Sequence, residues 1–204
     1  MRLHAQAWQE ALQPLGLRVA RRAIYEWEGE SGVVSARTLL SHSTQPSARA
    51  IRALLRDKER RFGRLARRVT VNPVLRSLLI RLKRRGVRLG LVTGTSRGEV
   101  RRALPRTVRG QFDVVVTGDR VRHGKPHPEP YLLACRRLKV LPRHVIVVEN
   151  APYGIQSARA AGAGLIVALT SSLPRRFLHE AHVIVGSVAR LSAILDRLTL
   201  GSSI

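Results

Sequence analysis

Three short apolar runs in the second half of the chain each end in polar residues that suit phosphate chemistry. These residues are Thr93-Gly94-Thr95 after the run 87–92, Lys125 in the loop after the run 113–116, and Glu149-Asn150 after the run 144–148. Hydroxyl groups and free backbone amides hold anions, an ammonium group neutralises charge, and carboxylate and amide oxygens hold a hard cation such as Mg²⁺. Together they would supply the positioning, charge neutralisation and metal that phosphoryl transfer requires.

Each of these signals, taken singly, also has an ordinary structural explanation. Thr95 or Ser96 could serve only as the N-cap of a following helix, and Lys125 could be a solvated loop lysine. Lysine is scarce in this chain, however, because the 37 basic residues include only Lys58, Lys83, Lys125 and Lys139 besides arginine. A lysine between Gly124 and Pro126 therefore favours a function that requires a compact point charge at this position and not a planar guanidinium.

The pattern around these runs predicts strands that alternate with helices. Strands are expected at 87–92, 113–116, 144–148, 164–169 and 182–185, and helices at 74–85, 96–104, 128–138 and 153–161. Such alternation predicts a mostly parallel, doubly wound α/β sheet of the Rossmann-like kind. Ligands bind such sheets at the carboxyl ends of the strands, where the polar residues above would lie.

The first part of the chain has a different pattern, with helical spacing and no strand-like run. Residues 3–13 place apolar side chains on one helical face, and Pro14 with Gly16 ends that segment. From 17 to 68 the pattern stays helical and rich in arginine, broken at 28–32 and 41–46. We expect two or three helices there, forming a small all-helical unit.

The composition is that of a packed protein with an unusual charge. Its 204 residues suffice for one core and a small inserted domain, and 44% of them are hydrophobic. The formal net charge of +24 makes nucleic acid, an anionic membrane or phosphorylated small molecules the first partners to consider. Because arginine is spread from Arg2 to Arg197 instead of forming a stripe, we expect no dedicated nucleic-acid site, although charge alone leaves that hypothesis open.

The cysteine content and the hydropathy of the sequence indicate the cellular location of the protein. Cys135 is the single cysteine, which excludes a disulfide within the chain and favours a reducing compartment. No apolar run approaches the ~20 residues of a membrane span. We therefore expect a cytoplasmic protein without a membrane partner, in which Cys135 is a buried structural thiol.

Three segments resemble the sequence motifs of a known superfamily. LVTGTS (91–96), TGDRVRHGKPHPEPY (117–131) and VVENAPYGIQSARAAG (147–162) are similar to motifs II, III and IV of the haloacid dehalogenase superfamily, and closest to its beta-phosphoglucomutase-like phosphatases. The resemblance runs through essentially the whole chain. It implies a doubly wound parallel sheet formed by residues 1–16 and 71–204 and a small all-helical cap formed by 17–70. We also expect a monomer, although the sequence alone leaves the oligomeric state open.

The resemblance also implies a role for each candidate residue. Thr93, with Gly94 and Thr95, would bind the transferring phosphoryl group; Lys125 would neutralise charge; Glu149 and Asn150 would hold Mg²⁺. In the cap, Glu28-Gly29 resembles the substrate loop, and Lys58 lies in a helix that can face the active site, an exposed helix charge being its alternative. The implied activity is a Mg²⁺-dependent phosphatase or phosphomutase acting on a small phosphorylated metabolite, similar to a sugar phosphate. A non-catalytic protein that binds phosphometabolites is the alternative.

Two departures from the family pattern bear on activity. The Asp-x-Asp motif, which in the family supplies the nucleophile on the first, central strand, would lie shortly before Leu3 and is not present in the sequence. Without that strand, those ending at Thr93 and Glu149 would face each other across a gap with unpaired backbone groups. We therefore expect that the natural protein begins upstream of Met1 and that residues 1–204 alone do not turn over. Asn150 replaces the usual aspartate, which should weaken Mg²⁺ binding.

Overall fold

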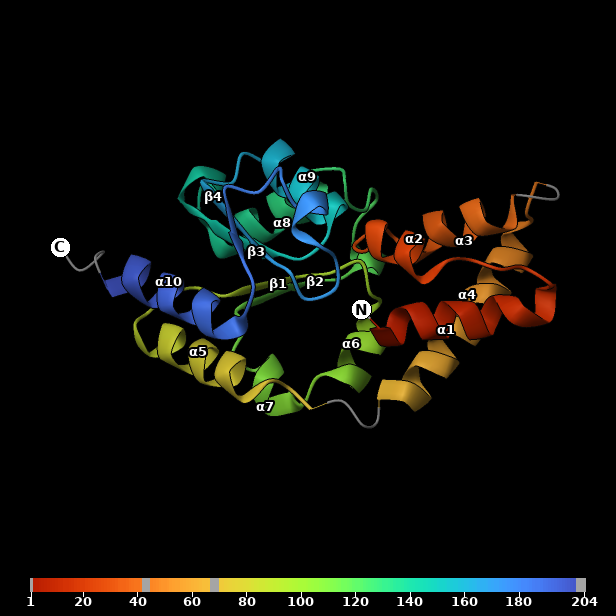
Figure 1. Ribbon diagram of the computed structural model, residues 1–204, viewed down its shortest axis with the longest axis horizontal. Helices are drawn as coiled ribbons and strands as arrows, with labels where there is room; N and C mark the ends of the chain where they lie inside the picture. Colours follow the sequence, from red (N-terminus) through yellow and green to blue (C-terminus); the bar gives the residue numbers. More distant parts are fainter. Residues whose placement is uncertain (1, 42–44, 67–69, 201–204) are drawn as a thin grey trace.

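The computed structural model describes residues 2–41, 45–66 and 70–200. The chain folds into a helical unit, built from its first third, and an α/β unit built from the rest (Figure 1). The two units lie side by side, and α6 (Arg97–Ala103) stands where they meet. The α/β class with parallel strands and a helical cap agrees with the prediction from sequence.

The described part of the helical unit contains four α-helices. They are α1 (Arg2–Leu12), α2 (Arg21–Glu26), α3 (Gly32–Leu40) and α4 (Ala48–Ala66). The end of α1 follows from its sequence, because Pro14 lies in a 3-10 turn and Gly16 adopts a left-handed φ of 68°. α3 begins at Ser31, whose Oγ accepts a hydrogen bond from the Val34 amide at 3.4 Å.

The helix α1 packs with α2, α3 and α4 in one apolar core. This core contains Trp8 and Leu12 of α1 together with Ile24 and Leu54. The predicted division of the sequence instead places residues 1–16 with the α/β core. In packing, α1 therefore belongs with the cap helices, since the apolar stripe of α1 faces α4; the division of the chain into domains stays a prediction.

The α/β unit alternates strands and helices as the sequence pattern predicts. The strands are β1 (Gly90–Val92), β2 (Val114–Val116), β3 (Ile146–Glu149), β4 (Leu165–Leu169) and β5 (Val183–Val185). The remaining helices are α5 (Pro73–Arg84), α7 (Arg106–Arg109), α8 (Glu129–Leu138), α9 (Pro152–Ala160) and α10 (Val188–Leu200). Most observed strands are shorter than the apolar runs that predicted them, and α10, which packs beside α5, was not predicted.

The strands of the described residues form two separate parallel sheets. One pairs β1 with β2, and the other has the order β3-β4-β5. Within the described residues no hydrogen-bonded ladder joins β1 to β3, so each has an edge without a strand partner. Val148, in the middle of β3, is 43% exposed although its neighbour Val147 is buried. These two edges are those that the sequence argument expected to flank a central strand.

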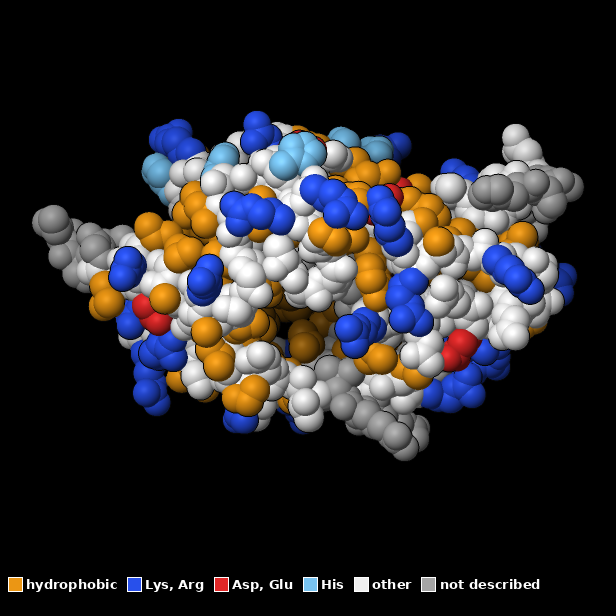
Figure 2. Space-filling model, viewed as in Figure 1, with side chains coloured by type: hydrophobic (Ala, Val, Ile, Leu, Met, Phe, Trp, Pro, Cys, Tyr) orange, Lys and Arg blue, Asp and Glu red, His pale blue; other side chains and the backbone are white. Residues whose placement is uncertain are grey.

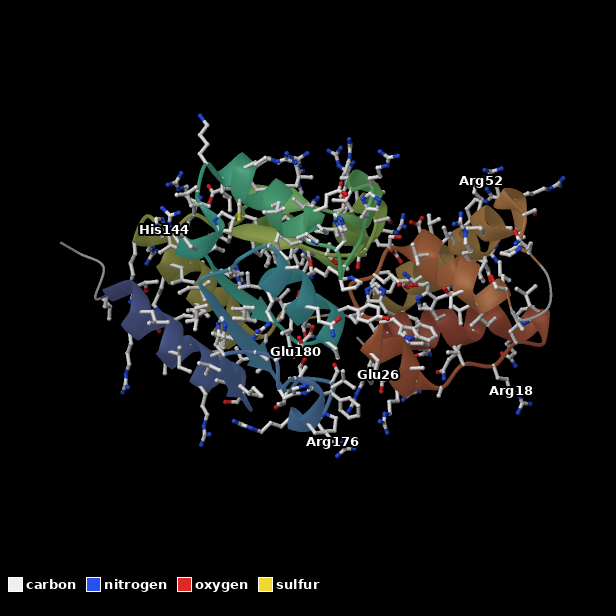
Figure 3. All side chains as sticks on the ribbon, turned by 90° about the horizontal axis from the view of Figure 1, so that it is seen from above. Arg18, Glu26, Arg52, His144, Arg176 and Glu180 are labelled. Carbon is white, nitrogen blue, oxygen red and sulfur yellow. The ribbon has the colours of Figure 1, made fainter. Side chains whose placement is uncertain are left out.

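The basic side chains are distributed over the surface of both units. Figure 2 shows them scattered over the visible face, and Arg18, Arg52 and Arg176 point outward from different elements in Figure 3. The same face has a hollow near its middle with hydrophobic side chains inside (Figure 2). No helix in the described part of the chain combines the length and the apolar character needed to cross a membrane.

The core of the helical unit gives a stability prediction. Leu12 is fully buried whereas Leu15, three residues later, is 53% exposed. We expect Leu12→Ala to lower the free energy of unfolding by about 2–5 kcal/mol, because it removes apolar contacts and leaves a cavity. Leu15→Ala is the matched control and should change it by less than about 0.5 kcal/mol. Urea titration of both variants measures this, and equal losses would contradict the assigned packing.

Candidate active site

The carboxyl ends of β1 and β3 meet at the side chain of Lys125. Its Nζ donates one hydrogen bond to the carbonyl of Val92, at 3.3 Å, and another to Oε1 of Glu149. Lys125 is 5% and Glu149 8% exposed, so both charges are withdrawn from solvent. A buried ammonium and a buried carboxylate each need the other, because either charge alone would carry a large desolvation cost. This ion pair links the two sheets.

The Glu149 carboxylate is fixed in place from several sides. The hydroxyl of Tyr131 also donates to Oε1, and the Asn150 amide donates to Oε2 at 3.1 Å. Burial, with the nearby Glu149 charge, raises the pKa of the Tyr131 hydroxyl well above its usual value, so it stays a donor. Gly154 of α9 leaves the carboxylate its room, since a Cβ there would lie 2.1 Å from the Glu149 carboxyl carbon.

The residues at the end of β3 suit Mg²⁺ in chemistry. Glu149 offers a carboxylate, and Asn150 a side-chain amide that donates to Ser171 Oγ at 3.1 Å. Magnesium is usually held by one or two carboxylates, with water and substrate phosphate completing its shell. The donor set is therefore of the right kind, although this chain supplies one negative charge there and Lys125 already pairs with it.

The turn after β1 holds a hydroxyl group and a backbone amide close together. Thr93 Oγ1 accepts a hydrogen bond from the Thr95 amide at 3.1 Å, and no described residue accepts one from the Gly94 N–H. Ser96, rather than Thr95, caps α6: its Oγ accepts from the Glu99 amide at 3.3 Å, and the Glu99 carboxylate accepts from the Ser96 amide. The capping explanation therefore applies to Ser96 and leaves Thr93 and Gly94 available for a ligand.

The loop between α2 and α3 lies directly on the strand ends. A Cβ on Gly94 would lie 2.4 Å from the carbonyl oxygen of Glu30, and one on Gly29, whose φ is +97°, would lie 2.6 Å from Cδ of Lys125. A Cβ on Gly124 would similarly lie 2.6 Å from the Ser31 amide nitrogen. Glycine is needed at these positions because two backbones, or a backbone and the lysine stem, approach too closely for a side chain.

A cavity opens beside this contact, between the helical unit and the turns after β1 and β2. Glu28, Gly29 and Lys58 contribute to its wall from the helical unit, and Gly94 and Thr95 from the α/β unit. Burial raises the pKa of the Glu28 carboxyl above its usual value, an effect that the nearby Lys58 and Lys125 ammonium groups oppose. The cavity thus joins both groups of candidate residues.

Lys58 is buried, so its alternative assignment as an exposed helix charge is wrong. Its Nζ donates to Oε1 of Glu99 at 2.7 Å, lies 3.3 Å from Nδ1 of His4, and sits 5.5 Å from the centres of the Trp8 and Phe62 rings. This ion pair ties α4 of the helical unit to α6. The substrate role of Lys58 stays a prediction.

The structure groups the predicted residues in two adjoining places. Glu149, Asn150, Lys125 and Thr93 lie at the strand ends, and the other predicted residues line the cavity. Sequence reasoning missed His4, Glu99 and Tyr131. Two of these had a signal, because Glu99 completes an S-x-x-E capping box and Tyr131 stands in the segment 117–131. His4 had none, since its neighbours come from distant segments.

The α/β fold with a helical unit and polar strand ends agrees with the family that the chain matches. Residues 2–162 match the haloacid dehalogenase-like hydrolase family, and the chain belongs to that family.

Curated and solved relatives agree with this assignment. The chain is 38% identical over 118 residues to "Phosphorylated carbohydrates phosphatase" of Thermotoga maritima, a match that covers 57% of this chain and 53% of that protein. It is 31% identical to "Protein CbbY" of Cereibacter sphaeroides over 81% of this chain and 76% of that one. In fold it is similar to the beta-phosphoglucomutase of Clostridium difficile, with a TM-score of 0.83 at 21% identity, covering 98% and 90% of the two chains. The chain spans about half the length of the Thermotoga relative.

The partly buried His4 gives a pH prediction. Burial, with the nearby Lys58 charge, holds the pKa of the His4 imidazole well below 6.5, so folding suppresses its protonation. Below pH 6.5 the unfolded chain therefore binds more protons, and stability should fall as the pH falls through that value, by at most about 1.36 kcal/mol per pH unit from this residue. Urea titrations from pH 8 to pH 5 measure the slope.

His4→Gln should reduce this slope, whereas His144→Gln, at an exposed position, should leave it unchanged. Identical slopes in the wild-type protein and in His4→Gln would contradict the suppressed protonation.

Proposed function

We propose that this chain is the larger part of a Mg²⁺-dependent phosphatase that acts on a small phosphorylated metabolite, similar to a sugar phosphate. The observation that carries the proposal is the buried Lys125–Glu149 pair at two adjacent strand ends, next to the anion-binding turn at Thr93. The names of the relatives support the phosphatase class and a carbohydrate phosphate as substrate. We further propose that the protein is a cytoplasmic monomer and that nucleic acid is not its ligand.

The nucleophile would come from a strand between β1 and β3. Both strands have unpaired edges within the described residues, and Lys125 bridges their carboxyl ends. A parallel strand inserted there would satisfy both edges and would end beside Lys125. An Asp-x-Asp pair at the end of such a strand, as the family resemblance implies, would face Glu149 and the turn at Thr93.

The residues of this chain would then divide the work of phosphoryl transfer. The Thr93 hydroxyl and the Gly94 amide donate hydrogen bonds to phosphoryl oxygens, and the Lys125 ammonium neutralises charge on the phosphate and the attacking carboxylate. Glu149 and Asn150 would hold Mg²⁺, which when bound neutralises further phosphate charge. The phosphoryl group would move from the substrate oxygen to one aspartate carboxylate of the pair, while the other aspartate gives a proton to the departing oxygen, which leaves as an alcohol. A water that loses a proton to the second aspartate would then attack the phosphorus and release inorganic phosphate.

The loop at Glu28–Ser31 would close the site. It already contacts Gly94 and Lys125, so a substrate placed in the cavity would be shielded from bulk water on that side. Opening of the helical unit would admit substrate and release product, as lids do in other enzymes.

An activity assay tests the proposed nucleophile strand. Hydrolysis of p-nitrophenyl phosphate should be absent from residues 1–204 and present in a form extended by the codons that precede Met1 in frame. A silent extended form would contradict the enzyme and favour a non-catalytic phosphometabolite-binding protein.

In the active form, Lys125→Ala should lower kcat/KM by about 10²–10³-fold or more, because it removes the cation that stabilises the transferring phosphate. Lys139→Ala, a lysine distant from the site in the loop after α8, is the matched control. Near-wild-type turnover of Lys125→Ala would refute the assigned role of Lys125.

Position 150 sets the charge at the metal site. Asn150→Asp should tighten Mg²⁺ binding by about tenfold, because a carboxylate replaces a neutral amide oxygen. Calorimetric titration with MgCl₂ measures it, with Asn72→Asp as control, since Asn72 caps α5 and Asp caps a helix equally well. An unchanged affinity would place position 150 outside the coordination shell.

A further inference from the structure

The wall of the cavity has a charge opposite to that of the chain as a whole. The chain has 37 basic and 13 acidic residues, yet the charged residues lining the cavity are Glu28, Glu30, Glu59, Glu99, Asp119 and Lys58. No arginine is among the described residues that line it. Basic side chains instead gather on the outer surface (Figure 2). A ligand in the cavity therefore meets a locally negative wall within a strongly positive protein.

Most of these carboxylates already have partners. Glu30 accepts from Ser35 Oγ at 2.8 Å, Glu99 from Lys58 Nζ at 2.7 Å, and Asp119 from the Arg97 amide at 3.1 Å. The single cation of the wall is thereby occupied as well. Among the described residues that line the cavity, no lysine or arginine remains that could pair with a second anionic group of a ligand.

Glu28 differs from the other acidic residues of the wall. No described residue donates a hydrogen bond to its carboxylate, although it lies in the loop that packs on Lys125 through Gly29. Glu28 is partly buried, and a partly buried carboxylate without a donor is less stable than a paired one, so a ligand that donates a hydroxyl or ammonium hydrogen to it would be favoured. A ligand carboxylate or second phosphate there would be disfavoured.

We infer that the cavity selects phosphomonoesters whose remaining part is neutral or cationic, and that Glu28 is the residue that sets this preference. The inference rests on the phosphatase function proposed above. The phosphate end would lie at Lys125 and Thr93, while hydroxyl or amine groups at the other end donate to Glu28. Substrates with a second anionic group are rejected because their charge would be buried against a carboxylate without a cation to pair with it.

The same charge distribution also indicates whether the proposed enzyme is a phosphatase or a phosphomutase. A mutase that passes through a bisphosphate must hold a second phosphate in the cavity beyond the reacting one. The described wall offers that phosphate only Lys58, which Glu99 already holds. The selectivity of the cavity therefore favours hydrolysis of monophosphates over phosphate migration through a bisphosphate.

Binding to the chain itself tests the inference without requiring turnover. Three sugar phosphates of similar size carry different charges remote from the phosphate: glucosamine 6-phosphate is cationic there, glucose 6-phosphate is neutral, and the open-chain acid 6-phosphogluconate is anionic. Calorimetric titration at pH 7 with Mg²⁺ should show the first two binding at least about tenfold more tightly than the third. Inorganic phosphate, titrated first, reports on the phosphate site alone.

The variant Glu28→Gln should reduce the ratio of affinities between the cationic and the anionic probe by about tenfold, because the amide keeps the size of the side chain and removes its charge. Glu26→Gln is the matched control, since Glu26 (labelled in Figure 3) ends α2, pairs with Arg22 and is not among the described residues that line the cavity. It should leave the ratio unchanged.

The possible results distinguish a failure of this inference from a failure of the proposed phosphatase function. Equal affinity for the three probes, with phosphate bound, would overturn the selectivity and leave the phosphatase proposal standing. Retention of the full ratio by Glu28→Gln would overturn the role of Glu28. Failure of phosphate and of all three probes to bind would overturn the proposed phosphate site and the selectivity together.

Discussion

The buried pair of Lys125 and Glu149 is the interaction on which the rest of the site depends. It joins the carboxyl ends of β1 and β3, which no hydrogen-bonded ladder connects within the described residues. The pair tolerates burial because each charge has the other nearby, and because Tyr131 and the Val92 carbonyl supply further hydrogen bonds. The two groups that link the sheets are also those to which the proposed phosphoryl transfer assigns roles, so the architecture and the proposed chemistry share one set of charges.

Close backbone contacts hold the helical unit against these strand ends. Gly29, Gly94 and Gly124 let the loop after α2 lie against the strand ends, and the buried Lys58–Glu99 pair fastens α4 to α6 beside it. The cavity between the units is formed by both of these contacts. Its acidic wall is then a consequence of which loops meet there, and it contrasts with the arginine-rich exterior (Figure 2).

Much of the fold could be predicted from sequence, because hydrophobic periodicity and turn residues act locally. The alternation of strands and helices after residue 73, the helical character of the first part and the buried state of Cys135 all agree with the structure. The ends of β1 and the helix α10 were less predictable, since strand length depends on which neighbour supplies hydrogen bonds and α10 is stabilised by packing on α5.

The sequence by itself determined the residue types and the strand ends at which Thr93, Lys125 and Glu149 stand, because parallel strands deliver such residues to one edge of a sheet. Only the tertiary structure decided their partners. It buried Lys58 against Glu99 and His4, placed Gly29 on Lys125, and gathered acidic side chains around the cavity. These contacts join segments far apart in the chain, and no local pattern encodes which of many possible partners a charged side chain will meet once both are withdrawn from water.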